Sequence, residues 1–190
     1  MTKPLTRLGT AGIICLLIAG CDTMVYQEPK DDMPFGGPSS TDYAADLWSA
    51  MAAAGLVGKG AITGTPYTGQ PPHGAILDTL DTTLQMGSHN GVLIVKRNFG
   101  GEGVSKQSVA NNPDKYLKAV TVMYKRESGY DPDNQNWFWV KYKADGSLDT
   151  NPAGMKLAGR VAKGKQKGCI ACHQAAPGGD MVFNHDRYKQ

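Results

Sequence analysis

Five consecutive residues near the end of the chain have the types and spacing needed to bind a metal cofactor covalently. They form the motif Cys169-Ile170-Ala171-Cys172-His173, a Cys-x-x-Cys-His sequence, which is the attachment signature of c-type haem. Two thiols three residues apart fall on one helical turn, so each can add to a vinyl group of the porphyrin. The imidazole beside the second thiol then reaches the iron. The motif predicts one covalent haem c, attached at Cys169 and Cys172, with His173 as the metal ligand.

Two other chemistries use paired cysteines, and both explain less of this motif. A structural zinc needs two further ligands at matched spacing, whereas the remaining histidines, His73, His89 and His185, stand beside no second cysteine pair. A redox Cys-x-x-Cys needs no histidine. Haem accounts for all three chemical groups of the motif.

The place of the motif in the chain bears on the second axial position of the iron. Met181 is the only methionine after His173 and follows it by eight residues, which span about 28 Å when fully extended. To reach the far side of the haem, the chain would have to pass round the porphyrin edge, and this path would use nearly the whole extended length of the segment. Met181 is therefore not expected to bind the iron, and the sequence marks no upstream methionine or histidine for that role. We expect five-coordinate iron with an open face; the alternative is an electron-transfer cytochrome with a sixth ligand from upstream.

The N-terminus has the pattern of a bacterial lipoprotein signal. Lys3 and Arg7 precede an apolar run over residues 11–19, which is too short to span ~30 Å of hydrocarbon as a helix. The residues Ile-Ala-Gly-Cys ending at Cys21 resemble a lipobox, so Cys21 is predicted to carry lipid. The alternative is an ordinary cleaved signal. Asp22 favours the inner membrane, as in enterobacterial lipoproteins, on the periplasmic side.

Composition and charge limit the remaining possibilities. A net charge of +3 over 190 residues is too weak to indicate a nucleic-acid-binding protein, and four cysteines are too few for a disulfide scaffold. We predict three segments: a signal peptide over 1–20, a Pro- and Gly-rich tether over 21–40, and a haem domain over 41–190.

The pattern of the haem domain predicts an α+β fold. Residues 43–55 form an expected amphipathic helix, with Ala44, Trp48, Met51 and Ala52 on one face. Four later segments alternate and are rich in β-branched and aromatic residues, which indicates a mainly antiparallel sheet. The basic segment 155–173 is predicted to be a helix that ends in the haem motif. The expected strands are 74–80, 91–99, 116–126 and 136–143.

Several segments together resemble the cytochrome P-460 / cytochrome c′-β family over most of residues 73–185. The resemblance rests on GVLIVKRNF (91–99), VMYKRESGYDPDNQNWFWVKY (122–142), GCIACH (168–173) and DMVF (180–183). It implies an antiparallel sheet with helices, a homodimer, and haem held by the C-terminal motif with its histidine as the sole protein ligand.

The resemblance also gives a role to Lys96. In cytochromes P-460, which oxidise hydroxylamine, a lysine of the Val-Lys strand is bonded to a porphyrin meso carbon, and Lys96 is the matching residue. Strand alternation puts Lys96 on one face with Val92 and Ile94, so an inward, haem-facing side chain is expected. The alternative is a surface lysine at a strand end.

One position departs from the oxidising members of that family. They use a distal glutamate as a proton relay, and the matching residue here is Thr121, which cannot act as a carboxylate base. Glu102 and Glu127 do not fall at that place. The distal side is expected to hold Thr121 and Met123, or their opposite-face neighbours Val120 and Val122.

These observations predict a membrane-tethered mono-haem cytochrome that binds a small neutral ligand such as NO, with a redox partner protein that the basic residues over 156–167 could dock. The alternative within the same family is an enzyme that oxidises hydroxylamine or NO through a Lys96-linked haem.

Overall fold

The computed structural model describes residues 33–183 of the chain. The predicted signal peptide, the predicted lipidation site Cys21, the first part of the tether and His185 lie outside these residues. Within the segment expected to be tether, Phe35 already forms a bridge with Gly159, and Gly36 donates its backbone N–H to the Ala158 carbonyl at 2.8 Å. The folded unit therefore includes Phe35.

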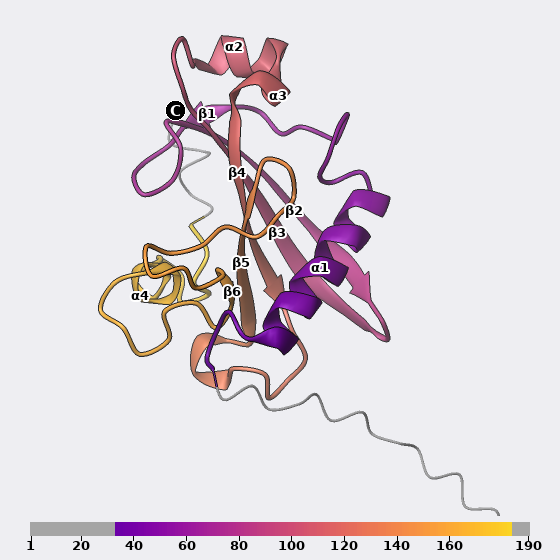
Figure 1. Ribbon diagram of the computed structural model, residues 1–190, viewed down its shortest axis with the longest axis vertical. Coiled ribbons are helices and arrows are strands. Elements are labelled where there is room, and N and C mark those ends of the chain that lie inside the picture. Colours follow the sequence, from indigo (N-terminus) through magenta and orange to yellow (C-terminus); the bar gives the residue numbers. More distant parts are fainter. Residues whose placement is uncertain (1–32, 184–190) are drawn as a thin grey trace, which may run out of the picture.

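An antiparallel sheet of six strands forms the centre of the molecule, and its strands lie side by side in the order of the sequence (Figure 1). This arrangement, with the helices, confirms the predicted α+β class. The strands are β1 (Tyr67–Thr68), β2 (Ile76–Met86), β3 (His89–Phe99), β4 (Leu117–Lys125), β5 (Trp137–Lys143) and β6 (Ala158–Gly159).

Strands β2 and β3 form a long hairpin that is paired from Ile76 with Phe99 to Met86 with His89. The prediction ended the first of these strands at residue 80, which is too early. Residues 81–83 are polar and exposed, so they carry no apolar alternation by which a strand can be recognised. The turn at Gly87, where φ is +57°, favours a glycine and closes the hairpin.

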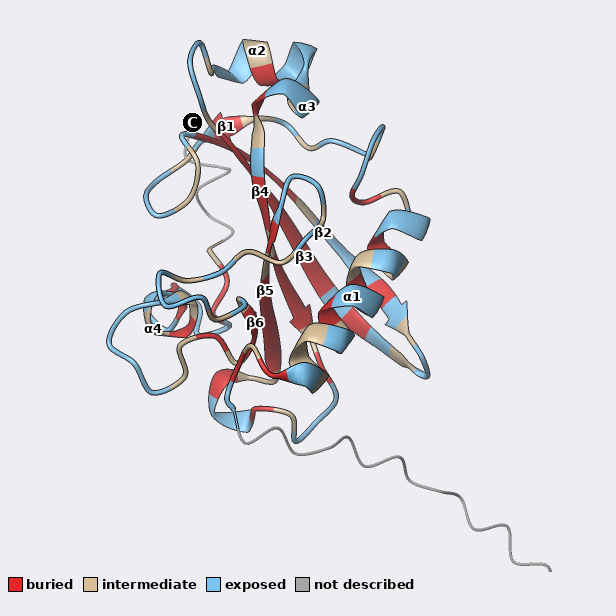
Figure 2. Cartoon of the chain, in the orientation of Figure 1, coloured by how far each residue is buried: buried red, intermediate tan, exposed pale blue. Residues whose placement is uncertain are grey.

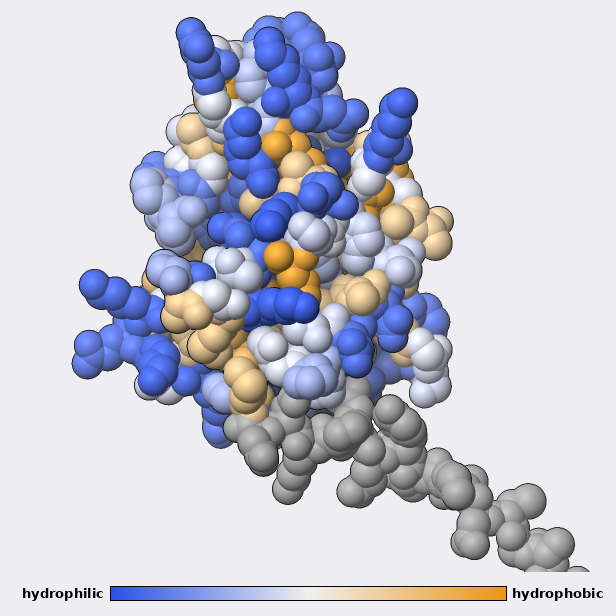
Figure 3. Space-filling view, in the orientation of Figure 1, coloured by the Kyte–Doolittle hydropathy of each residue, from blue (hydrophilic) through white to orange (hydrophobic). Residues whose placement is uncertain are grey.

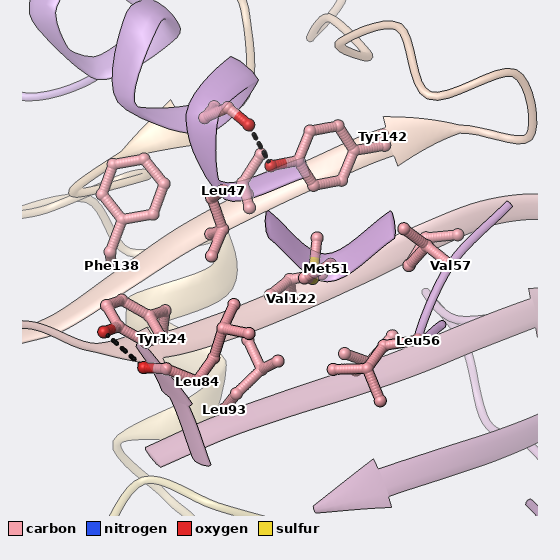
Figure 4. Packing of buried hydrophobic residues seen from close by; sticks show 14 of the residues in the cluster. Leu47, Met51, Leu56, Val57, Leu84, Leu93, Val122, Tyr124, Phe138 and Tyr142 are labelled. Carbon is pink, nitrogen blue, oxygen red and sulfur yellow. Dashed lines mark hydrogen bonds between the residues drawn. The ribbon is translucent and has the colours of Figure 1, made fainter. Parts of the chain in front are cut away.

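Helix α1 (Pro38–Ala53) crosses one face of the sheet and supplies the main core. Leu47 and Met51 point from the helix at side chains of the strands, as Figure 4 shows. The Tyr142 hydroxyl donates to the Ala44 carbonyl at 2.7 Å and ties β5 to the helix. The expected apolar face was partly wrong, because Ala52 is exposed whereas Leu47 is fully buried.

Alternation along each strand gives the sheet two different faces. On β3, Leu93 and Val95 pack in the α1 core, whereas Ile94 belongs to a second cluster on the other face. Trp137 and Trp139 of β5 also lie in that second cluster. The middle strands are buried over most of their length (Figure 2), so a layer of chain covers each face.

The basic segment before the haem motif is not a helix, and that prediction was wrong. Residues 155–168 form turns around β6, and only Cys169–His173 are helical, as α4. The backbone φ is positive at Gly159, Ala162, Gly164 and Gly168, and left-handed residues interrupt an α-helix. Lys163 of this segment pairs with Asp131 and Asp133. The other short elements are α2 (Lys106–Asn111), α3 (Pro113–Tyr116) and η1 (Pro132–Asn134).

The described part of the chain has no helix that is both long and apolar enough to cross a membrane. The face seen in Figure 3 is mostly hydrophilic, and hydrophobic side chains appear there in patches separated by polar ones.

Candidate functional site

Helix α4 presents the predicted haem-attachment residues on one helical turn. Cys172 is exposed, Cys169 is half-buried against the second cluster, and both are free thiols. His173 at the end of the turn is buried and lies against the sheet. Gly168, with φ +129°, allows the chain to enter the turn, and its carbonyl accepts the Cys172 N–H at 3.1 Å. The Cys172 thiol therefore faces outward, whereas Cys169 packs against the same cluster as the imidazole.

The imidazole of His173 is held in the form that binds metals. Its Nδ1 lies 2.7 Å from the backbone carbonyl oxygen of Met181. A carbonyl only accepts, so Nδ1 carries the proton and Nε2 carries the lone pair. Burial, with a smaller contribution from the positive charge of Lys96, lowers the pKa of His173 to about 4, although the hydrogen bond to the Met181 carbonyl acts to raise it. The ring is neutral at physiological pH, with Nε2 as its basic atom.

Two aromatic rings fix the plane of His173. The Trp139 ring lies 4.8 Å from it and the Phe183 ring 5.2 Å, both measured between centroids and both edge to face. The indole Nε1 of Trp139 is buried, and no acceptor among residues 33–183 receives its hydrogen. A buried donor without a protein partner can bond to an acceptor on a water or on a bound group. The site therefore fits a cofactor that the protein alone does not supply.

Lys96 lies on the same face of the sheet as His173. It is 9% exposed and stands opposite Thr121 in the register of β3 and β4. The Thr121 hydroxyl donates to the Lys96 carbonyl at 3.3 Å. The structure thus places the predicted ligand and the predicted cross-linking lysine on the same face of the sheet.

The sheet separates the candidates for the distal side into two sets. Met123 packs in the second cluster, and Thr121 is on the same face. Val120 and Val122 pack in the α1 core instead, so they are not at this site. Of the two glutamates, Glu127 is exposed and pairs with Arg126 at 2.8 Å.

His73 is a residue of this site that the sequence reasoning missed. Its ring lies 6.4 Å from the His173 ring between centroids, with an angle of 83° between the planes. Its Nδ1 is 3.0 Å from Oδ1 of Asn98, two residues beyond Lys96 on β3. His73 follows a turn between β1 and β2, where nothing local to the sequence marks it. His73 comes close to the Cys-x-x-Cys-His motif, which lies about a hundred residues later in the chain, only because of the way the sheet folds.

The donor set fits haem c better than a protein-bound metal ion. Within residues 33–183, no cluster of three or more histidine, cysteine or acidic side chains could hold a metal. A structural zinc is therefore not supported by the described part of the chain. Cys169, Cys172 and His173 would hold haem by two thioether bonds and one iron–imidazole bond.

Comparison with known proteins gives one match. The family model for cytochrome P460 matches residues 78–184. No curated protein and no solved structure matches the chain. The matched range contains Lys96, Thr121 and the Cys-x-x-Cys-His motif, and it begins after His73.

Proposed function

Because the chain belongs to the cytochrome P460 family, it is a c-type haem protein with one covalent haem c, and we propose that it binds a small neutral ligand such as NO at that haem. The observation that carries the proposal is the state of His173. A buried neutral imidazole with Nδ1–H donated to the Met181 carbonyl offers Nε2 to iron. Cys169 and Cys172 attach the porphyrin on the same helical turn.

The residues on the sheet face support a neutral ligand in preference to proton-coupled oxidation. The haem iron, when bound, supplies the site at which a diatomic molecule coordinates. The chain supplies Thr121 and Met123 on that face, and neither side chain can replace the glutamate that the oxidising members use as a proton relay. Such surroundings favour binding over turnover of hydroxylamine.

Titration of the purified holoprotein with NO tests this proposal. We expect saturable, reversible changes in the absorption spectrum of the ferrous protein and negligible consumption of hydroxylamine in the presence of an electron acceptor. A spectrum that does not change with NO would contradict the proposal, as would sustained hydroxylamine oxidation without detectable NO binding.

The burial of Lys96 on the haem face favours a second candidate, an enzyme that oxidises hydroxylamine or NO with haem bonded to that lysine. Peptide mass spectrometry of the holoprotein separates the two. A mass of haem shared between the peptide of Lys96 and that of Cys169 and Cys172 would support the enzyme. Lys96→Arg is the control, because it keeps the charge and abolishes the bond.

The proposed setting is the periplasmic side of a bacterial membrane, where this family generally occurs, with lipid on Cys21 and an inner-membrane location favoured by Asp22. Exposed Lys156, Lys165 and Lys167 near α4 are the charges that an acidic redox partner would meet. The protein is proposed to act as a homodimer and not to bind nucleic acid. Release of the Cys21→Ala variant from membranes and the solution mass of the holoprotein test the anchor and the dimer.

A further inference from the structure

We propose that His73 is the second axial ligand of the haem iron in the ligand-free protein, and that an incoming small ligand displaces it. The displacement rests on the proposed function, whereas the ligation of iron by His73 does not depend on it. His73 lies outside the range matched by the family model, so the proposal concerns a feature of this chain.

The separation of the two histidine rings carries the proposal. Their centroids are 6.4 Å apart. A metal bonded to one nitrogen of each ring puts the ring centres about 6.4 Å apart, taking ~2.0–2.1 Å per metal–imidazole bond and ~1.2 Å from nitrogen to ring centre. A molecule between the iron and His73 would add a hydrogen bond of about 2.8 Å to a bond of ~2 Å. The observed separation therefore fits ligation by both rings and is too short for an intervening ligand.

The hydrogen bonding of His73 gives it the same tautomer as His173. The amide nitrogen of Asn98 donates to two backbone carbonyls and to the Thr121 hydroxyl. Its Oδ1 is therefore the accepting atom, and it receives Nδ1–H of His73 at 3.0 Å. The lone pair of neutral His73 is on Nε2, as it is in His173. In each ring Nδ1–H is bonded to an oxygen acceptor and Nε2 carries the lone pair, which is the usual arrangement of a metal-binding histidine.

The register of the sheet places the gap between the rings over Thr121. His73 is attached to Asn98, and His173 contacts Trp139. On β4, Asn98 pairs with Ala119 and Trp139 pairs with Met123. Thr121 lies midway between these two residues of β4 and on the same face of the sheet. Lys96 stands opposite Thr121. A porphyrin between the two rings would thus have an edge above the Lys96–Thr121 pair.

The proposal changes the expected coordination of the iron. Five-coordinate iron then describes the protein after His73 has left the metal, not its resting state. His73 is half-buried in the connection between β1 and β2, and such connections move more readily than the strands they join. The apparent affinity for NO equals the intrinsic affinity multiplied by the fraction of molecules in which His73 has left the iron.

Absorption and electron paramagnetic resonance spectra of the ligand-free holoprotein test the ligation. We expect low-spin ferric and ferrous spectra for the natural protein and high-spin spectra for His73→Gly. Added imidazole should restore the low-spin spectra of His73→Gly, which also shows that this variant is folded. His89→Gly is the matched control, because His89 is equally half-buried but bonds to the Lys125 carbonyl, away from His173. It should keep the natural spectra.

Two results would overturn the inference. One is a high-spin natural protein, and the other is a low-spin His73→Gly variant without added imidazole. NO binding is measured separately. If His73 occupies the iron in 90% or more of the molecules, His73→Gly gains at least about tenfold in NO affinity. Failure of both proteins to bind NO would reject the proposed function while the spectra still decide the ligation by His73.

Discussion

The carbonyl group of Met181 controls the chemistry of His173 although its side chain does not take part. It accepts the Nδ1 hydrogen at 2.7 Å, while the Met181 side chain is buried in the second cluster. The backbone φ of +64° at this residue turns the chain. The accepting atom is a main-chain oxygen, so any residue that can adopt this backbone conformation would provide the same hydrogen-bond acceptor.

A substitution at Met181 separates these two roles. We expect Met181→Leu to keep the absorption spectrum of the natural holoprotein, because the volume is nearly conserved and the carbonyl remains. The spectrum in ferric and ferrous states is the measurement. A change from low-spin to high-spin iron in this variant would mean that the thioether sulfur binds the metal.

At the residue scale, the sequence reveals the attachment motif and not the groups that orient it. Cys169, Cys172 and His173 are contiguous, so their chemistry is readable directly. The acceptor on Met181 and the approach of His73 depend on how the tail and the β1–β2 connection fold over the sheet. Pairings of this kind leave no local pattern, because backbone carbonyls are common to all residues.

Strands β3, β4 and β5 are the elements that the sequence predicts best. The expected 91–99, 116–126 and 136–143 differ from the observed bounds by one or two residues, because apolar alternation runs through each of them. The helix predicted over 155–173 fails over residues 155–168 for the opposite reason. Its lysines suggested a solvated helical face, whereas its glycines impose turns.

Helix α1 and the haem site lie on opposite faces of the sheet, which predicts that the core can be weakened without altering the site. Leu47→Ala should lower the free energy of unfolding by about 2–5 kcal/mol, because it opens a cavity in a fully buried position. Ala52→Ser on the exposed side of the same helix should change it by less than about 0.5 kcal/mol. Denaturant unfolding measures both, and an altered haem spectrum in Leu47→Ala would contradict the separation.

A buried ion pair joins β2 and β3 on the α1 side. Nε of Arg97 lies 2.8 Å from the Asp78 carboxylate, and both side chains are almost completely buried. Burial raises the pKa of Asp78 above its usual value, even though Arg97 acts to lower it. The folded protein therefore takes up a proton on Asp78 more readily than the unfolded chain does.

Removal of Arg97 should make this effect large. We expect Arg97→Met to lose about 3–5 kcal/mol of stability near neutral pH, because Asp78 is left buried without its counter-ion. The folded protein binds the proton more tightly, so its stability rises as the pH falls, and the deficit should shrink as the pH is lowered from neutral toward the ordinary pKa of an aspartate. Urea unfolding at several pH values measures this. A deficit that grows toward acid pH would contradict the assignment.

At the scale of the whole molecule, the sheet divides a structural side from a chemical side. The family match begins at residue 78, so α1 lies outside it although α1 completes the core. The fold of the matched region therefore depends on residues that precede it in the chain.

This division predicts how the protein responds to loss of haem. In a Cys169→Ala/Cys172→Ala variant without haem, amide hydrogen exchange should stay slow in α1 and β3 and become fast in α4 and residues 174–183. The cofactor stabilises only the side that it contacts, and its loss lowers the melting temperature. Equal loss of protection in α1 and α4 would mean that the two sides fold as a single unit.

The position of α4 after β6 also determines the order in which the parts of the site are synthesised. A chain is synthesised from its N-terminus, and domains begin to fold in that order. All six strands precede the Cys-x-x-Cys-His motif, and the carbonyl that sets the proton on His173 comes later still. All the strands of the sheet are therefore synthesised before the predicted metal ligand and the carbonyl that accepts its hydrogen. A chain truncated between His173 and Met181 would contain all six strands and the histidine, but it would lack the carbonyl that accepts the Nδ1 hydrogen of His173.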